Sequence, residues 1–120
     1  MSPQWERLAL LYTYDECGAF FAHVPPPEAC RAFPSRAPFA TMGPRIPLVT
    51  ISPWSKRSYV SHVPGDHTAI TRFIEAIFDL PALTARDANS DALLDMFDVS
   101  CGRDLSVAPA PSPGTGGCTK

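Results

Sequence analysis

Proline limits what this chain can fold into more than any other feature of its sequence. There are 14 prolines among 120 residues, more than twice the usual share of about 5%. Proline breaks helix interiors and cannot donate the hydrogen bond that a central strand needs. Because the prolines lie between the periodic segments, the sequence predicts a loop-rich chain and not a regular helical bundle. A chain of this length makes at most one small domain.

The periodic segments predict a mixed α/β order of strand, long loop, strand, short strand, helix, helix. Apolar runs favour buried strands at 7–14 and 46–51, with a very short third strand at 59–62. Residues 24–44 are proline-rich and lack periodicity, as expected for a long irregular loop. A second helix is expected at 89–97. Two or three short strands make a marginal sheet, so the chain is expected to be one edge of a larger α/β sheet.

The clearest helix begins near Asp66. An apolar stripe follows at helical spacing, formed by Ile70, Phe73, Ile74, Ile77 and Phe78. Asp66 or Thr68 can cap the start of this helix, and Pro81 stops its continuation.

Charge and cysteine content exclude several classes of protein. The net charge of −2 gives no reason to expect binding to nucleic acid or to an anionic membrane surface. No apolar run is long enough for a transmembrane segment, and no signal peptide is visible. The four cysteines have no zinc-like spacing, so unpaired thiols are expected, with a Cys17–Cys30 bridge and a small disulfide-stapled module as alternatives.

Two adjacent carboxylates, Asp15 and Glu16, come directly after the first apolar run. A strand that ends in the crevice of an α/β sheet presents ligands in this way, and two neighbouring carboxylates are costly to hold together without a cation. The sequence therefore suggests a divalent metal site here. The alternative is a solvated acidic turn.

Two histidines are further candidates for the site. His23 follows aromatic residues, where a histidine is more often packed than catalytic. His67 lies at the start of the predicted helix, where free backbone amides favour anions, and the alternative is a surface residue in the first turn beside a capping Asp66.

Three ordered blocks of the sequence resemble the phosphoesterase family, which includes bacterial phospholipases C and acid phosphatases of the alkaline phosphatase superfamily. The first block, matching the family segment YDE-x-GG-x-YDHVPPP, is Tyr14-Asp15-Glu16-x-Gly18-x-Phe20-x-x-His23-Val24-Pro25. The second runs from Gly43 to Trp54 and continues at Tyr59-Val60-Ser61-His62. The third is Asp66-His67-Thr68-x-Ile70-x-Arg72-Phe73-Ile74-Glu75, followed by Leu83-Thr84-x-Arg86-Asp87. The resemblance spans 2–98.

The resemblance implies the C-terminal portion of an alkaline-phosphatase-like α/β sandwich at 1–98, and the composition predicts a disordered Pro/Gly-rich tail at 99–120. The resemblance also implies hydrolysis of phosphate esters, with phospholipids among the substrates. Asp15 and Glu16 would be ligands of a divalent metal ion whose identity is not fixed, and His23 and His67 would be catalytic. Family members are often exported, which leaves the location of this chain open.

Parts of the family pattern are missing from the sequence. Ala22 replaces the aspartate before the histidine, Ala19 the second glycine, and Phe21 the tyrosine. The family's nucleophile and its N-terminal glutamate-asparagine metal motif lie upstream of the matched segment and are absent here. The isolated chain is therefore expected to be inactive and to need the missing N-terminal half. The alternative is a truncated remnant that acts through binding or assembly.

Overall fold

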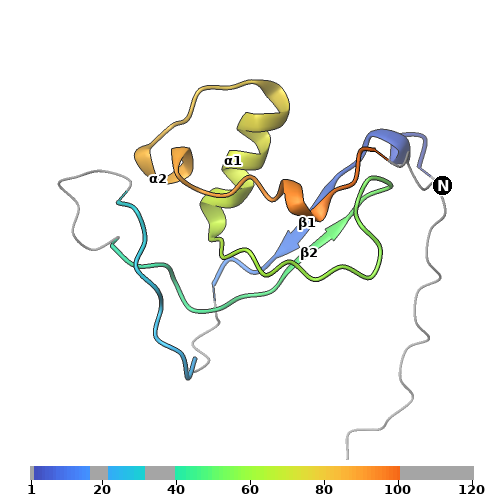
Figure 1. Ribbon diagram of the computed structural model, residues 1–120. Coiled ribbons are helices and arrows are strands. Elements are labelled where there is room, and N and C mark those ends of the chain that lie inside the picture. The colour runs from blue at the N-terminus through green and yellow to red at the C-terminus, as the bar shows by residue number, and fades with distance from the viewer. Residues whose placement is uncertain (1, 17–21, 32–39, 101–120) are drawn as a thin grey trace, which may run out of the picture.

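A computed structural model describes residues 2–16, 22–31 and 40–100. Two short strands, two α-helices and two 3-10 turns follow one another along the chain (Figure 1). They are η1 (Trp5–Arg7), β1 (Leu10–Thr13), β2 (Leu48–Ile51), α1 (His67–Phe78), α2 (Ala85–Ala88) and η3 (Leu94–Met96). The predicted C-terminal tail falls almost wholly outside the described residues.

Strands β1 and β2 form an antiparallel pair in which Leu10 lies opposite Ile51 and Thr13 opposite Leu48. Both strands lie inside the segments where apolar runs predict them, and β2 begins directly after Pro47, as the missing N–H of proline requires. Among the described residues, each strand pairs only with the other, so both outer edges carry unpaired backbone groups.

The third strand expected at 59–62 is wrong, because side chains and not backbone groups hold this segment. The Tyr59 hydroxyl donates to Asp95 Oδ2 at 3.0 Å, and the Ser61 hydroxyl donates to the same oxygen at 2.5 Å. The hydrogen bond to Asp95 is the main reason that the pKa of Tyr59 is raised. These contacts tie the loop to η3.

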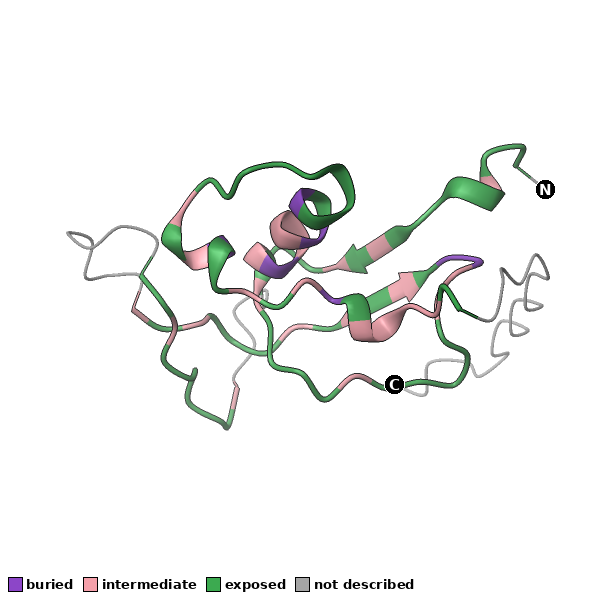
Figure 2. Cartoon of the chain, turned by 45° about the horizontal axis from the view of Figure 1, so that its top comes forward, coloured by how far each residue is buried: buried purple, intermediate pink, exposed green. Residues whose placement is uncertain are grey.

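The two faces of the strand pair differ in exposure, so that exposed and half-buried residues alternate along each strand (Figure 2). Leu10 is 48% exposed and Tyr12 is 55% exposed, which corrects the expectation that the first strand is buried. The opposite face is half-buried, and there the Thr50 hydroxyl lies 3.4 Å from the Met96 sulfur.

Helix α1 confirms the predicted helix near Asp66. Asp66 is its N-cap, accepting a hydrogen bond from the Thr68 backbone N–H. The helix ends at Asp79, whose left-handed conformation (φ 51°) closes the last turn before Pro81. Of the predicted apolar stripe only Phe73 is buried, where it stacks on Phe97 with ring centroids 5.0 Å apart. The exposed members of the stripe are Ile74, Ile77 and Phe78.

The second helix predicted at 89–97 is wrong in position. The helical turn α2 ends at Ala88, just before that helix was expected to begin, and in the described residues that follow only η3 is helical. Leu93 interrupts the segment with a left-handed backbone (φ 56°), and its N–H is held by Asp91 Oδ1 at 2.7 Å. Leu93 is buried.

Residues 93–98 lie between the strand pair and α1 (Figure 1). The Lys56 N–H donates to the Met96 carbonyl at 2.9 Å, and the Asp98 N–H donates to the Trp54 carbonyl at 2.8 Å. Among the described residues the buried core is small, since its hydrophobic members are Ala69, Phe73 and Leu93. In this part of the chain no helix has the length and hydrophobicity that crossing a bilayer requires.

Candidate functional site

The two candidate carboxylates lie just beyond the end of β1. Asp15 and Glu16 are both exposed and follow Tyr14 in a bend of the backbone. One oxygen of Asp15, Oδ1, accepts the Glu16 N–H at 3.0 Å, which fixes the orientation of the Asp15 side chain. The structure therefore places both carboxylates at a strand end with access to solvent.

His67 meets this strand end from the start of α1. Its Nε2 lies 2.9 Å from the Tyr14 carbonyl oxygen. Because a carbonyl oxygen can only accept, Nε2 carries the hydrogen and Nδ1 is left as the nitrogen with a free lone pair. The contact joins the first residue of α1 to the residue that precedes Asp15, so sequence positions about fifty apart lie side by side.

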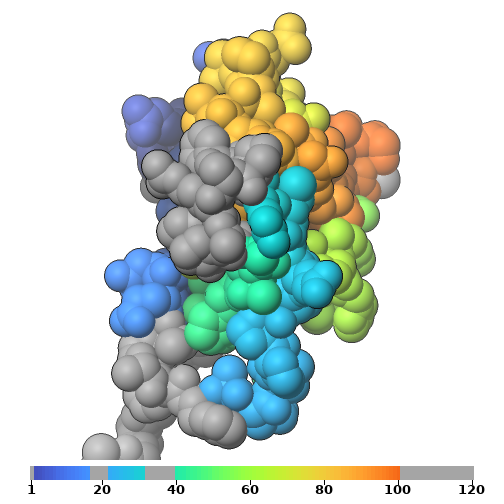
Figure 3. All heavy atoms as spheres, turned by 90° about the vertical axis from the view of Figure 1, so that its left-hand side faces the viewer, coloured from blue at the N-terminus to red at the C-terminus, as the bar shows by residue number. Residues whose placement is uncertain are grey.

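His23 is exposed and belongs to the segment 22–31. In the part of the chain that the structure describes, no hydrogen bond joins His23 to Asp15, Glu16 or His67. Figure 3 shows the beginning of this segment (blue to cyan) extending away from the helices (yellow to orange). The structure thus places His67 beside Tyr14, at the strand end that Asp15 and Glu16 follow, and gives His23 no hydrogen bond to them.

A complete metal centre is not formed by the described residues. Within 2–16, 22–31 and 40–100, no three histidine, cysteine, aspartate or glutamate side chains lie close enough together to hold an ion. Zinc sites use at least three protein ligands, whereas magnesium is often held by one or two carboxylates together with water and substrate oxygens. Asp15, Glu16 and His67 are therefore at most an incomplete set of ligands.

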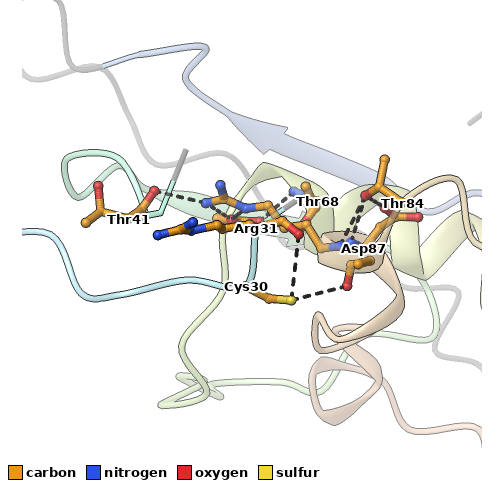
Figure 4. A network of polar contacts seen from close by, with 9 residues as sticks. Cys30, Arg31, Thr41, Thr68, Thr84 and Asp87 are labelled. Atoms are coloured by element: carbon orange, nitrogen blue, oxygen red, sulfur yellow. Dashed lines mark hydrogen bonds and ion pairs between the residues drawn. The ribbon is translucent and has the colours of Figure 1, made fainter. Parts of the chain in front are cut away.

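A polar network packs α1 against α2 and the loop before β2, and sequence reasoning missed its central residue, Arg86. The Arg86 guanidinium forms an ion pair with Asp66 Oδ2 at 2.6 Å and donates to the Thr41 carbonyl at 3.2 Å. Figure 4 shows this network, in which the Cys30 sulfur also lies 3.6 Å from the Ala85 carbonyl. Cys30 is a free thiol, as expected for an unpaired cysteine, whereas Cys17 lies outside the described residues.

Two buried carboxylates, Glu75 and Asp87, form the second feature that sequence reasoning missed. Both accept the Leu83 N–H, at 3.3 Å and 2.7 Å, and Asp87 also accepts the Thr84 hydroxyl. Burial alone would raise the pKa of Asp87, but the hydrogen bonds from Thr84, Glu75 and Leu83 lower it overall. The signal for this site is the spacing of Thr84 and Asp87, which matches a helix capping box.

Asp66 gives a test of the network. We expect Asp66→Ala to lower the free energy of unfolding by about 2 to 3 kcal/mol, because it removes both the N-cap and the ion pair with Arg86. Asp66→Asn keeps the capping oxygen and should cost about 1 kcal/mol. Urea unfolding followed by circular dichroism measures both effects.

Asp79→Asn is the matched control, because Asp79 lies at the other end of α1 and asparagine tolerates its left-handed backbone. Equal losses for Asp66→Asn and Asp66→Ala would contradict the capping role.

The stabilisation by Asp66 also depends on pH. Burial opposes ionisation of Asp66, but the hydrogen bonds from Thr68 and Arg86 lower its pKa below 3.8 overall. Its contribution is therefore complete above the unfolded pKa and is lost as the pH falls through the folded one.

Comparison with known proteins assigns this arrangement of strand end and helix start to a family. The sequence matches the Phosphoesterase family over residues 1–81, which include both strands, α1 and the residues Asp15, Glu16, His23 and His67. The chain therefore belongs to the phosphoesterase family.

Its curated relatives are phospholipases C. Non-specific phospholipase C1 of Arabidopsis thaliana is 36% identical over 105 residues, which cover 72% of this chain and 20% of that protein. Phospholipase C B of Mycobacterium tuberculosis is 34% identical over an alignment of 128 residues, which covers 90% of this chain and 23% of the relative. Non-hemolytic phospholipase C of Burkholderia pseudomallei is 35% identical over 94 residues, 62% of this chain and 13% of the relative. The chain thus spans about a fifth of the length of these relatives.

Proposed function

We propose that this chain forms part of a phosphoesterase domain that hydrolyses the phosphate ester bond of phospholipids. The observation that supports this most directly is the match to the phosphoesterase family over both strands and α1, together with relatives named as phospholipases C. The fold that we propose for the complete domain is an α/β sandwich of the alkaline-phosphatase type, with β1 and β2 as two of its strands.

Asp15 and Glu16 are the residues that we propose as metal ligands. This proposal is supported by the exposed position of both residues at the end of β1. The hydrogen bond from the Glu16 N–H uses Asp15 Oδ1 and leaves Asp15 Oδ2 and the Glu16 carboxylate outside that contact. The described residues do not supply a third ligand, so the remaining ligands would come from other parts of the domain. A divalent ion bound there would polarise the phosphoryl oxygens of a substrate.

His67 is proposed to act as a proton acceptor in the reaction through Nδ1, which carries a lone pair in the neutral ring. The Nε2–H of His67 donates to the Tyr14 carbonyl, and this hydrogen bond orients the ring while Nδ1 takes no part in it. His23 is retained as a second candidate for the same role, and it would have to approach from the segment 22–31.

A second function, binding or assembly without catalysis, is favoured by one observation. Ala19, Phe21 and Ala22 replace a glycine, a tyrosine and an aspartate of the family's first motif. A remnant of a phosphoesterase domain would keep the family's folded parts and lose its turnover. The experiment below separates the two functions.

A chimaera tests the proposed function. The segment of the Arabidopsis relative that aligns with this chain is replaced by the aligned residues of this chain, and hydrolysis of phosphatidylcholine is measured. We expect the chimaera to be active and Asp15→Asn to lower kcat/KM by about 100-fold or more, because a lost ligand removes charge stabilisation worth several kcal/mol. His67→Gln should lower it by about 10-fold to 100-fold.

Glu28→Gln is the control, since Glu28 is an exposed acidic residue in the segment 22–31 and lies outside the proposed site. It should keep the activity of the parent chimaera. A folded chimaera without activity would refute the catalytic function and favour the remnant. Full activity in Asp15→Asn would exclude Asp15 as a ligand.

A further inference from the structure

One face of the strand pair consists of exposed apolar side chains. The register places Leu10 opposite Ile51 and Tyr12 opposite Val49, so these four side chains project to the same side. The Tyr14 ring continues the row, with its centroid 6.1 Å from that of Tyr12 in an edge-on contact. We call these five residues the apolar sheet face.

All five residues are between 45% and 55% exposed. Monomeric proteins rarely leave a contiguous apolar patch of this kind uncovered, and a two-stranded sheet is marginally stable unless it packs against something else. On the opposite face, Met96 already contacts Thr50. The sheet is therefore covered on one side only in the described part of the chain (Figure 2).

The chemistry of the face restricts its occupant. None of its five side chains carries a charge, so the face offers no ion-pairing partner to a phosphate, a nucleic acid or a charged peptide. The carboxylates of Asp15 and Glu16 lie directly beyond its end, which disfavours contact with an anionic lipid surface. An apolar protein surface fits both features.

The length of the relatives leaves room for such a surface. The matched segment is about a fifth of their length, so most of each relative's polypeptide lies outside it. Both strands lie within the residues that match the family. We propose that the apolar sheet face is an internal surface, covered by an apolar layer from the rest of a phosphoesterase domain. This inference rests on the larger domain that the proposed function requires.

Lysine scanning of the face tests this proposal without an activity measurement. Val49→Lys is made in the 120-residue chain and in the chimaera with the Arabidopsis relative. In the isolated chain Val49 is exposed, and the melting temperature should change by no more than about 1 °C. In the chimaera the charge would be buried, and the melting temperature should fall by about 5 °C or more.

Val60→Lys is the matched control, because Val60 is 70% exposed and lies outside the face. It should leave both proteins unchanged. Hydrogen exchange gives a second readout, and amides at 10–13 and 48–51 should exchange at least about 10-fold more slowly in the chimaera than in the isolated chain.

Several results would overturn the proposal. One is a chimaera whose melting temperature is unaffected by Val49→Lys, and another is a wild-type chimaera that does not fold. Sedimentation showing a dimer of the isolated chain that Val49→Lys dissociates would assign the face to a second copy. Binding to phosphatidylcholine vesicles that Val49→Lys abolishes would assign it to lipid. A stable chimaera that Val49→Lys destabilises but that lacks phospholipase activity would keep this proposal and refute the proposed function.

Discussion

Replacing Phe73 by alanine should lower the free energy of unfolding by about 3 to 5 kcal/mol, as is usual for a buried phenylalanine. The Phe73 ring is 9% exposed and lies nearly parallel to that of Phe97, at an interplanar angle of 17°. Among the described residues only Ala69 and Leu93 share its hydrophobic burial, so little else could fill the cavity. The loss is measured by urea unfolding followed through the helical circular dichroism signal.

Ile77→Ala provides the comparison within the same helix. Ile77 is 55% exposed, and its truncation should cost less than about 1 kcal/mol. Similar losses for the two variants would mean that the stack of Phe73 on Phe97 does not hold α1 in place. Phe97→Leu should cause an intermediate loss, because it keeps apolar volume and removes the ring stacking.

The second large effect is expected from Asp87→Ala, at about 2 to 4 kcal/mol. The substitution leaves the Thr84 hydroxyl without its acceptor and leaves the Leu83 N–H with only the longer, 3.3 Å bond to Glu75. Because Asp87 is 2% exposed, water cannot replace the lost partner. Thermal unfolding and urea unfolding should agree on the loss.

Glu75→Gln is the appropriate control, since glutamine has the same shape and keeps an oxygen that can accept the Leu83 N–H. Its cost should stay below about 1 kcal/mol, because the ion pair that it removes is long, at 3.5 Å, and Arg72 is partly exposed. A larger loss for Glu75→Gln than for Asp87→Ala would show that Glu75 and not Asp87 organises the turn before α2.

Acid should reproduce part of the Asp87 effect. The folded state lowers the pKa of Asp87 below the ordinary value of 3.8, so the carboxylate stabilises the fold fully above that value. As the pH falls below 3.8 the unfolded chain takes up the proton first, and the contribution of Asp87 declines. Unfolding measured from pH 6 to pH 2 should therefore show a steeper decline for the wild type than for Asp87→Asn.

Local signals in the sequence were sufficient to predict α1 and the two strands. The i, i+3, i+4 spacing from Ile70 and the capping Asp66 act within a few residues, and the structure keeps both. The strand segments were also correctly placed, although their burial was not. A short apolar run gives no information on whether anything covers the strand, and Leu10 and Tyr12 are exposed.

Predictions failed where distant contacts decide the backbone. Tyr59 and Ser61 are held by Asp95, more than thirty residues away, so their extended segment never pairs as a strand. Leu93 adopts a left-handed backbone that no apolar pattern indicates. The pairing of His67 with the Tyr14 carbonyl likewise joins elements about fifty residues apart, and only the three-dimensional structure shows it.

Residues 93–98 link α1 to the strand pair. Met96 contacts β2, Phe97 stacks on α1, and Asp98 donates to the loop that follows β2. Release of this segment would remove a supporting contact from the helix and from the sheet at the same moment. We therefore expect α1 and the strand pair to unfold together, and cleavage of the peptide backbone between Leu93 and Asp98 to destabilise both.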